Sequence, residues 1–370
     1  MAELLTNTTD LTKVASAIRE KGGTSDSLVY PDGFVTAIQA IQTGTELKIV
    51  VSVTSGAAVT ATKGSNTVSG TSVNGTCTLT VPEAGTWSVK ATLGGETSNT
   101  KSVTFTDSYD VTLAFVSPTL NDNDWTKIRE VSDKGDGANY WSIGDRKAVT
   151  LNGTVGTLTL SNYTIYAFIL GFNHNAELEG QNRIHFQLGK TALSGGTDVA
   201  LCDYAYNNMG GGFRMNTSNT NNGGWESSQM RTAICGTSLT SYSGTILAVI
   251  PAALRAVLKS VTKYTNNIGN SYAETAVTAT TDYFFLLSEY EVFGAKKYSN
   301  VDEKNKQAQY AYYSAGNSKI KYNHGATSTA VIVWLRSSAY QAYFVSVKVD
   351  GTVDTQFAGY SEGFAPGFCV

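Results

Sequence analysis

The sequence predicts an α+β protein with more than one domain. Its 370 residues exceed the length of one typical domain. Only 15% of the residues are charged, and 20 tyrosines accompany 36 glycines, a composition that suits strands and long loops better than helical bundles. Apolar residues alternate with period two over much of the chain, whereas helical spacing is confined to a few segments.

Residues 1–44 predict two short helices. Thr9 or Asp10 suits the N-cap of the first helix, and Pro31 suits the first turn of the second. The apolar residues at helical spacing are Leu11, Val14, Ala17 and Ile18 in the first helix and Phe34, Ile38 and Ile41 in the second. Two helices of this length cannot bury both stripes alone, so we expect an attachment or oligomerisation module that packs on copies of itself or on a partner. A cap on the next domain is the alternative.

Residues 45–107 predict a small β-sandwich of immunoglobulin-like type. Short runs of alternating residues are separated by Gly, Ser and Asn turn signals throughout this stretch. The side chains expected to face inward are those of Ile49, Val51, Val53, Val59, Leu79, Val81, Trp87 and Val89. No catalytic constellation occurs here, and we therefore expect a spacer domain.

Residues 108–370 predict one large C-terminal domain of short strands and long loops. Helices are expected only over residues 224–235 and 250–265, and residues 286–294 are expected to form a core strand followed by a glycine turn. The apolar stripe of the second of these helices consists of Leu254, Val257, Leu258 and Val261.

Two arginines in this domain are expected to be structural. We expect Arg231 and Arg336 to be semi-buried guanidiniums that satisfy loop carbonyls or pair with Glu289 or Glu291.

Charge and hydropathy exclude some classes of function. The net charge of −3 gives no electrostatic footprint for nucleic acid or for an anionic membrane. No apolar run approaches the ~18 residues that a membrane span needs. The first residues show neither the basic nor the apolar segment of a signal peptide. We therefore expect a chain that is made in the cytoplasm without a signal peptide, binds no nucleic acid and does not insert into a membrane.

Residue types that carry catalysis or bind metals are sparse. His174 and His185 lack the HExxH spacing of zinc hydrolases, and we expect them and His324 to be structural histidines with satisfied ring nitrogens. The oxygen-rich run at 121–124 could bind Ca²⁺, but a solvated turn is favoured. We therefore expect no enzyme, no metal site and no cofactor.

The cysteines predict buried thiols. All 4 are scattered without a CxxC pair. A disulfide between Cys202 and Cys235 stays open as an alternative. Cys369 has apolar neighbours, which indicate an inert thiol rather than a nucleophile or a copper ligand.

The segment 330–370 is the strongest candidate for recognition. Its register can be predicted, because a slip of one residue moves every side chain to the other face of a strand. A three-residue loop at 350–352 with Gly351 left-handed pairs Val347 with Thr355 and keeps the valines on one inner face.

The opposite face of this hairpin and the loops beside it form the expected ligand-binding surface. Loops rich in tyrosine and small residues suit recognition, because tyrosine gives a large contact area at low entropic cost. An ordinary surface hairpin is the alternative. The candidate ligand-binding residues are Ser338, Ala339, Tyr340, Gln341, Ala342, Tyr343, Ser346, Lys348, Asp354, Gln356, Gly359 and Tyr360.

Seven ordered motifs in the C-terminal part carry a resemblance to a known family. They are YWSIGDRKAVTLNG (140–153), ILGFNHN (169–175), NNGGWESSQMRT (221–232), FLLSEYEVFG (285–294), QYAYY (309–313), VWLRS (333–337) and GFAPGFCV (363–370). Their order resembles that of C-type-lectin-like domains in gut bacterial and phage proteins. Some members of that family are the variable proteins of diversity-generating retroelements, whose variable region corresponds here to residues 334–370. The N-terminal segment ASAIREKGGTSDSLVYPDGFVTAIQAI resembles a module of phage tail proteins.

The resemblance implies a fold and a function. It implies a C-type-lectin-like domain in a phage tail receptor-binding protein or adhesin, located in the virion, that binds a host cell-surface protein or glycan. Other phage tail proteins are the expected partners, and a homo-oligomer, with a trimer as the first expectation, would add avidity. Two alternatives remain open: an enzyme on the related formylglycine-generator-like fold, and a purely structural tail or surface protein.

Overall fold

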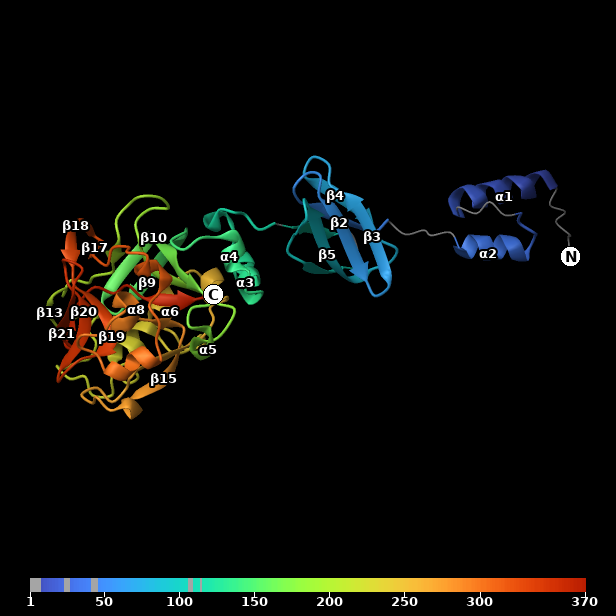
Figure 1. Ribbon diagram of the computed structural model, residues 1–370. Helices are drawn as coiled ribbons and strands as arrows, with labels where there is room; N and C mark the ends of the chain where they lie inside the picture. Colours follow the sequence, from blue (N-terminus) through green and yellow to red (C-terminus); the bar gives the residue numbers. More distant parts are fainter. Residues whose placement is uncertain (1–7, 23–26, 41–45, 106–108, 114) are drawn as a thin grey trace. The chain divides into compact units, whose positions relative to one another are not determined.

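The computed structural model describes residues 8–22, 27–40, 46–105, 109–113 and 115–370, and its architecture is α+β (Figure 1). The chain divides into two units, Met1–Phe115 and Val116–Val370. The signal-peptide expectation rests on residues 1–11, of which 1–7 lie outside the described part. In the described part, no helix has the length and hydropathy that a membrane span requires.

The N-terminal helices form a hairpin with a very small core. Helix α1 spans Thr8–Gly22 and α2 spans Asp32–Ala40, so Pro31 directly precedes α2. The side chains buried between them are those of Ala15, Ile18, Phe34 and Ala37. The expected stripes were therefore partly wrong: Val14 is 47% exposed and Ile38 is 52% exposed. The small core consists of two alanines, one isoleucine and one phenylalanine, so Val14 and Ile38 lie outside it. Ile41 lies outside the described residues.

Residues 46–105 and 109–113 form two sheets with one shared core. One sheet has the order β4-β1-β8; the other has the order β3-β2-β5-β6, with β7 also paired to β5. Their bounds are β1 Lys48–Ser52, β2 Ala58–Lys63, β3 Asn66–Thr71, β4 Thr76–Thr80, β5 Gly85–Leu93, β6 Glu96–Thr97, β7 Lys101–Phe105 and β8 Tyr109–Thr112. Every side chain expected to face inward is buried, which confirms the strand pattern.

The boundary between the two units differs from the expected position. The junction 107/108 itself lies outside the described residues. Strand β8 (Tyr109–Thr112), however, pairs in parallel with β1, and Val111 and Leu113 are buried in the same core. The sequence around 111–117 had been assigned to the C-terminal domain because its alternation does not show which sheet it joins.

The C-terminal unit contains several small sheets around one large core. A five-stranded sheet has the order β16-β23-β11-β10-β9, so the last strand of the chain lies inside the sheet. Its bounds are β9 Arg146–Val155, β10 Leu158–Phe172, β11 Ile184–Lys190, β16 Phe284–Phe285 and β23 Gly367–Cys369. A three-stranded sheet, β19-β20-β21, carries the expected recognition segment and consists of Val333–Ser338, Tyr343–Val347 and Val353–Phe357.

Short elements complete this unit. The remaining strands are β12 Val199–Ala200, β13 Asn208–Met209, β14 Val261–Asn266, β15 Val277–Asp282, β17 Lys321–Asn323, β18 Ala326–Val331 and β22 Tyr360–Ser361. The α-helices are α3 Trp125–Asp133, α4 Gly137–Tyr140, α5 Ala176–Glu179, α6 Ile246–Val249, α7 Ala252–Arg255, α8 Glu289–Phe293 and α9 Ala311–Ser314. 3₁₀ turns occupy Leu120–Asp122, Glu274–Ala276 and Val301–Asn305, and a π turn occupies Met230–Cys235.

Three element assignments in this unit differ from the expectation. The helix expected over 224–235 is only the π turn Met230–Cys235. The helix expected over 250–265 is only the four-residue α7, after which β14 pairs with β15. Its apolar stripe is nevertheless buried as expected, because a buried run of this kind does not distinguish a helix from a strand. Residues 286–294 contain helix α8 instead of a core strand, because Ser288 and Glu291 form a capping box. The expected glycine turn is present: Gly294 ends the helix with φ +66°.

Candidate functional site

The three-stranded sheet presents the expected recognition segment as an edge hairpin. Strands β20 and β21 pair Val347 with Val353 and Val345 with Thr355. The backbone N–H of Lys348 donates to the carbonyl of Thr352 at 2.8 Å, which encloses a three-residue loop, and Gly351 is left-handed at φ +82°. The loop has the predicted length and the predicted left-handed glycine, but it spans 349–351 instead of 350–352. The register is two residues away from the predicted pairing, so each strand keeps its alternation of faces.

The twelve candidate residues divide by exposure. Tyr340, Gln341 and Lys348 are exposed, whereas Ala342, Tyr343, Asp354, Gln356 and Tyr360 are half-buried. The buried candidates are Ser338, Ala339, Ser346 and Gly359. The central strand β20 is covered on both faces, because Ser346 is as buried as the valines beside it. The buried candidates therefore support the surface and do not form it.

A continuous row of aromatic rings crosses this surface. Ring centroids of Tyr340 and Tyr343 lie 4.8 Å apart, those of Tyr343 and Phe357 lie 4.3 Å apart, and those of Phe357 and Tyr360 lie 6.0 Å apart. Tyr298 extends the row at 6.5 Å from Tyr340. We call these five rings the aromatic face.

The aromatic face lies on the side of the hairpin that was expected to face inward. Tyr343, Thr355 and Phe357 share that side with the valines, and the hydroxyl of Tyr340 lies 3.2 Å from that of Thr355. At the edge strand this side is only half-buried. The predicted outer side, with Asp354 and Gln356, is half-buried as well, so β21 is accessible from both sides.

A methionine extends the apolar surface at the end of the aromatic face. Strand β13 pairs with β22 so that Met209 lies opposite Tyr360, and opposite residues point to the same side of a sheet. Met209 is 53% exposed. A flexible thioether beside aromatic rings adapts to varied ligand shapes.

The polar candidates on β21 are engaged by their own strand. Asp354 accepts the backbone N–H of Thr355 at 2.9 Å, and its other oxygen lies 3.4 Å from the ammonium of Lys348. Gln356 accepts the N–H of Phe357 at 3.0 Å and donates to the buried carboxyl of Glu362. These side chains cover the outward N–H groups of the edge strand.

The loop that carries Tyr340 is clamped from below. The side-chain amide of Asn221, which is buried, donates to the carbonyls of Ala339, Tyr340 and Tyr343 at 3.0–3.2 Å. Ala342 is held in the left-handed region at φ +70°, a conformation that costs a non-glycine residue on the order of 1 kcal/mol. The loop is therefore held in a single conformation by its surroundings.

A buried network of charges lies beneath β19. Arg336 is fully buried and forms a bidentate ion pair with Glu291, as the sequence predicted for one of the two possible glutamates. Lys263 lies 2.9 Å from Glu291 and 2.5 Å from Glu179. Burial alone would raise the pKa of Glu291, but Arg336 and Lys263 hold it far below its usual value. Burial dominates at Glu179 and raises its pKa to about 7, although Lys263 opposes this shift.

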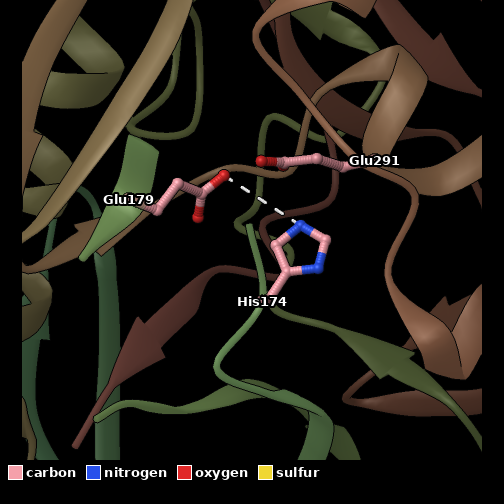
Figure 2. A group of neighbouring side chains, drawn as sticks. All are labelled: His174, Glu179 and Glu291. Carbon is pink, nitrogen blue, oxygen red and sulfur yellow. Dashed lines mark ion pairs between the residues drawn. The ribbon is translucent and has the colours of Figure 1, made fainter. Parts of the chain in front are cut away.

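Three members of this region could be mistaken for a metal site. His174, Glu179 and Glu291 offer ligand atoms that lie within 4.8 Å of one another (Figure 2). Lys263 donates to both carboxylates and to the hydroxyl of Tyr310, so an ammonium already fills the position between the carboxylates. The donor set therefore fits an internal cation better than a metal ion.

The expectation of satisfied histidines is wrong for two ring nitrogens. The Nε2 atoms of His174 and His185 are buried with no hydrogen-bond partner among the described residues. Burial, with Lys263 nearby, lowers the pKa of His174 to about 3 and that of His185 well below its usual value. Both rings are therefore neutral and pack beside Tyr310.

The other arginine, the cysteines and the run at 121–124 also have structural roles. Arg231 pairs with Asp282, not with a glutamate. All four cysteines are free and buried, and burial raises the pKa of Cys369 to about 12. Residues 121–124 follow the expected turn in part: a 3₁₀ turn ends at Asp122, and Asp122 and Asp124 are exposed. Asn123 is buried and binds the backbone of Ser117, and Asp124 caps α3.

Comparisons with known proteins match only part of the chain. Residues 200–370 match a family described as a domain of unknown function, DUF6273. No curated protein and no solved structure matches the chain. The matched segment contains the entire aromatic face and the pair Arg336–Glu291, whereas Glu179 lies outside it.

Sequence reasoning missed several parts of the site. Tyr298 and Met209 come from distant segments, and nothing local indicates that they join the hairpin. Phe357 was assigned to the inner face because alternation alone does not identify the exposed edge strand of a sheet. Asn221 could be suspected from the turn-rich run NNGG, but its three acceptors lie more than a hundred residues away in sequence.

Proposed function

We propose that this protein is a receptor-binding protein or adhesin of a phage tail and that its aromatic face binds a host cell-surface protein or glycan. The observation that carries the proposal is the aromatic face itself: five rings in contact, half-exposed, at a sheet edge. Tyrosine-rich surfaces on a rigid support bind with little loss of side-chain entropy.

In this proposal, each of the other parts of the chain has a role in presenting the aromatic face. We infer a C-type-lectin-like fold for the C-terminal unit and an immunoglobulin-like spacer for the sandwich. The helical hairpin is the proposed attachment module, because Val14, Val35 and Ile38 remain exposed around a core too small to be stable alone. Assembly into a trimer on a tail, beside other tail proteins in the virion, would multiply weak sites by avidity.

Burial restricts which residues of 334–370 could vary in a diversified protein. Residues 334–338 are buried, and so are 361–370. The accessible positions are the loop 340–343, the turn 348–352, strand β21 and Tyr360. Variation at these positions would change the binding surface and leave the core intact.

Cell binding by the full chain tests the proposal. Labelled protein is titrated onto a panel of gut bacteria, and bound protein is measured by flow cytometry. The variant Tyr340→Ala/Phe357→Ala is expected to lose binding, whereas Tyr109→Ala is the matched control because Tyr109 is 43% exposed, like Tyr340 at 45%, but lies on the other unit. Unchanged binding by the folded double variant would refute this placement.

Three further measurements separate the proposal from its alternatives. Sedimentation of the full chain as a clean monomer would exclude trimer avidity. Copper-dependent turnover would support an enzyme on the formylglycine-generator-like fold, and an aromatic face protected between subunits would support a structural tail protein.

A further inference from the structure

A cleft on the C-terminal unit is lined by several positively charged side chains and shares no residue with the aromatic face. It has a volume of about 430 Å³, and the residues that define its chemistry are Arg129, Asp133, Arg183, Lys259, Ser260 and Tyr283. We call it the basic cleft. Three cations face one carboxylate, which leaves a net charge of +2 among the charged residues of the lining.

The single carboxylate is shared by two of the cations. The Nε of Arg129 donates to both oxygens of Asp133 at 2.9 and 3.0 Å, and the ammonium of Lys259 lies 2.7 Å from the same carboxylate. Burial lowers the pKa of Lys259; Asp133 opposes the shift, and Arg129 and Arg183 add to it. The positive charge of the cleft is therefore incompletely compensated.

Arg183 has no carboxylate partner among the described residues. Its Nε and Nη2 donate to the carbonyl of Ser260 at 3.0 and 2.9 Å, and its Nη1 donates to the carbonyl of Gln181 at 2.7 Å. These carbonyls fix the plane of the guanidinium. A guanidinium carries five N–H groups, so Arg183 retains donors beyond these contacts. Arg129 does so as well, since apart from Asp133 it donates from Nη1 to the carbonyl of Val257 at 2.8 Å.

We propose that the basic cleft binds a phosphate group, borne either by a glycan or by a lipid. Two guanidinium groups held in fixed planes suit the oxygens of phosphate, because the arginine fork donates in parallel to such oxyanions and is weakly hydrated. A net charge of +2 matches a phosphate monoester better than a carboxylate. The volume far exceeds the ~30 Å³ share of one water molecule, so the group that bears the phosphate also has room.

A second cleft provides the matched control. It has a volume of about 380 Å³ and contains Arg146, whose Nη1 donates to the carbonyls of Ala192 and Gly195 at 2.7 and 2.6 Å. Asp145 lines the same cleft, so its charged lining residues sum to zero. Arg146 thus resembles Arg183 in its hydrogen bonding but not in the net charge around it.

The proposal is tested by calorimetric titration of the full chain with inorganic phosphate, α-glucose 1-phosphate and glucuronate, and by flotation with phosphatidylcholine vesicles with and without phosphatidic acid. Arg183→Gln is expected to weaken phosphate binding about tenfold, as expected for the loss of a charge-assisted hydrogen bond. Arg146→Gln is expected to bind like the unaltered chain. Asp133→Asn is expected to bind phosphate more tightly, a gain that a folding defect cannot mimic.

Each outcome decides the proposal. Binding of the sugar phosphate without vesicle flotation assigns a glycan-borne phosphate, and flotation that requires phosphatidic acid assigns a lipid headgroup. Tighter binding of glucuronate than of phosphate would overturn the phosphate assignment. No binding of any phosphate compound, or equal effects of Arg183→Gln and Arg146→Gln, would overturn the site. These readouts use no host cell, so they are independent of the proposed function.

Discussion

Replacing Arg336 by methionine removes the centre of the buried charge network. The guanidinium is fully buried and donates to Glu291, to the carbonyl of Leu286 at 2.9 Å and to the hydroxyl of Thr265 at 2.7 Å. Methionine keeps much of the side-chain volume, so loss of packing is a secondary effect. The main consequence is that Lys263 becomes the single cation between Glu179 and Glu291.

The expected cost follows from that uncompensated charge. Removing one partner of a buried ion pair costs about 3–5 kcal/mol, because the other partner stays desolvated. Domains are stable by only about 5–15 kcal/mol, so the loss is a large fraction of the stability of this unit. In Glu291→Gln/Arg336→Met both members are neutral, and glutamine still suits the capping box of α8. The double variant should therefore be less destabilised than the sum of the single variants by about 2 kcal/mol.

Urea unfolding, with hydrogen exchange read in peptides of α8 and β19, measures these differences. Lys348→Met is the control, because its pair with Asp354 is 51% and 39% exposed and such pairs contribute about 0.2–1 kcal/mol. Additive single and double effects, or a loss for Arg336→Met as small as that for Lys348→Met, would refute the reasoning.

Three further predictions concern pH, the clamp and a glycine. Burial raises the pKa of Glu362 to about 8, so the folded state holds a proton that the unfolded state releases near pH 4–5; unfolding free energy should fall as pH rises from about 5 to 8, and Glu362→Gln should reduce that slope by up to about 1.4 kcal/mol per pH unit. Asn221→Ala removes the donor to three loop carbonyls and should cost about 1–3 kcal/mol, with faster amide exchange in 339–343; unchanged exchange would contradict the clamp. Gly269→Ala should be far more destabilising in thermal unfolding than Gly316→Ala, because both glycines have positive φ but only at Gly269 would a Cβ overlap the carbonyl of Asn221; equal losses would show that strain alone matters.

The sandwich could be predicted from the sequence because local alternation and local burial agree there. Trp87 and Val89, for example, alternate with polar residues along β5 and are completely buried. The same logic correctly identified the left-handed Gly351. The same logic failed for 250–265. Apolar residues are buried there in either kind of element, so their spacing predicted which side chains are buried but did not predict strand β14.

The sequence predicted which segment carries the recognition surface, but it did not predict all the side chains that form it. Tyr340, Tyr343 and Tyr360 were found because they belong to one local segment. Tyr298 joins them only through tertiary contacts, and Lys263 joins the charge network in the same way. The capping box at Ser288 and Glu291 was a local signal that was available and was outweighed by the apolar run before it.

The buried charge network and the aromatic face are connected through strand β19. The network connects α5, α8, β14 and β19 through Glu179, Glu291, Lys263 and Arg336. Strand β19 leads directly into the loop that carries Tyr340. A loop held in this way loses little entropy on binding, so rigid rings can contribute most of their contact energy to affinity.

The edge strand β21 also indicates how a ligand would be bound. An exposed edge usually invites an added strand from another chain, because its N–H and carbonyl groups lack partners. Here the N–H groups of Thr355 and Phe357 are already occupied by the side chains of Asp354 and Gln356. An incoming peptide strand would have to displace both side chains, and Gln356 is additionally held by Glu362. Contact through the aromatic rings requires no such displacement, so recognition by side chains is favoured over strand addition at this edge.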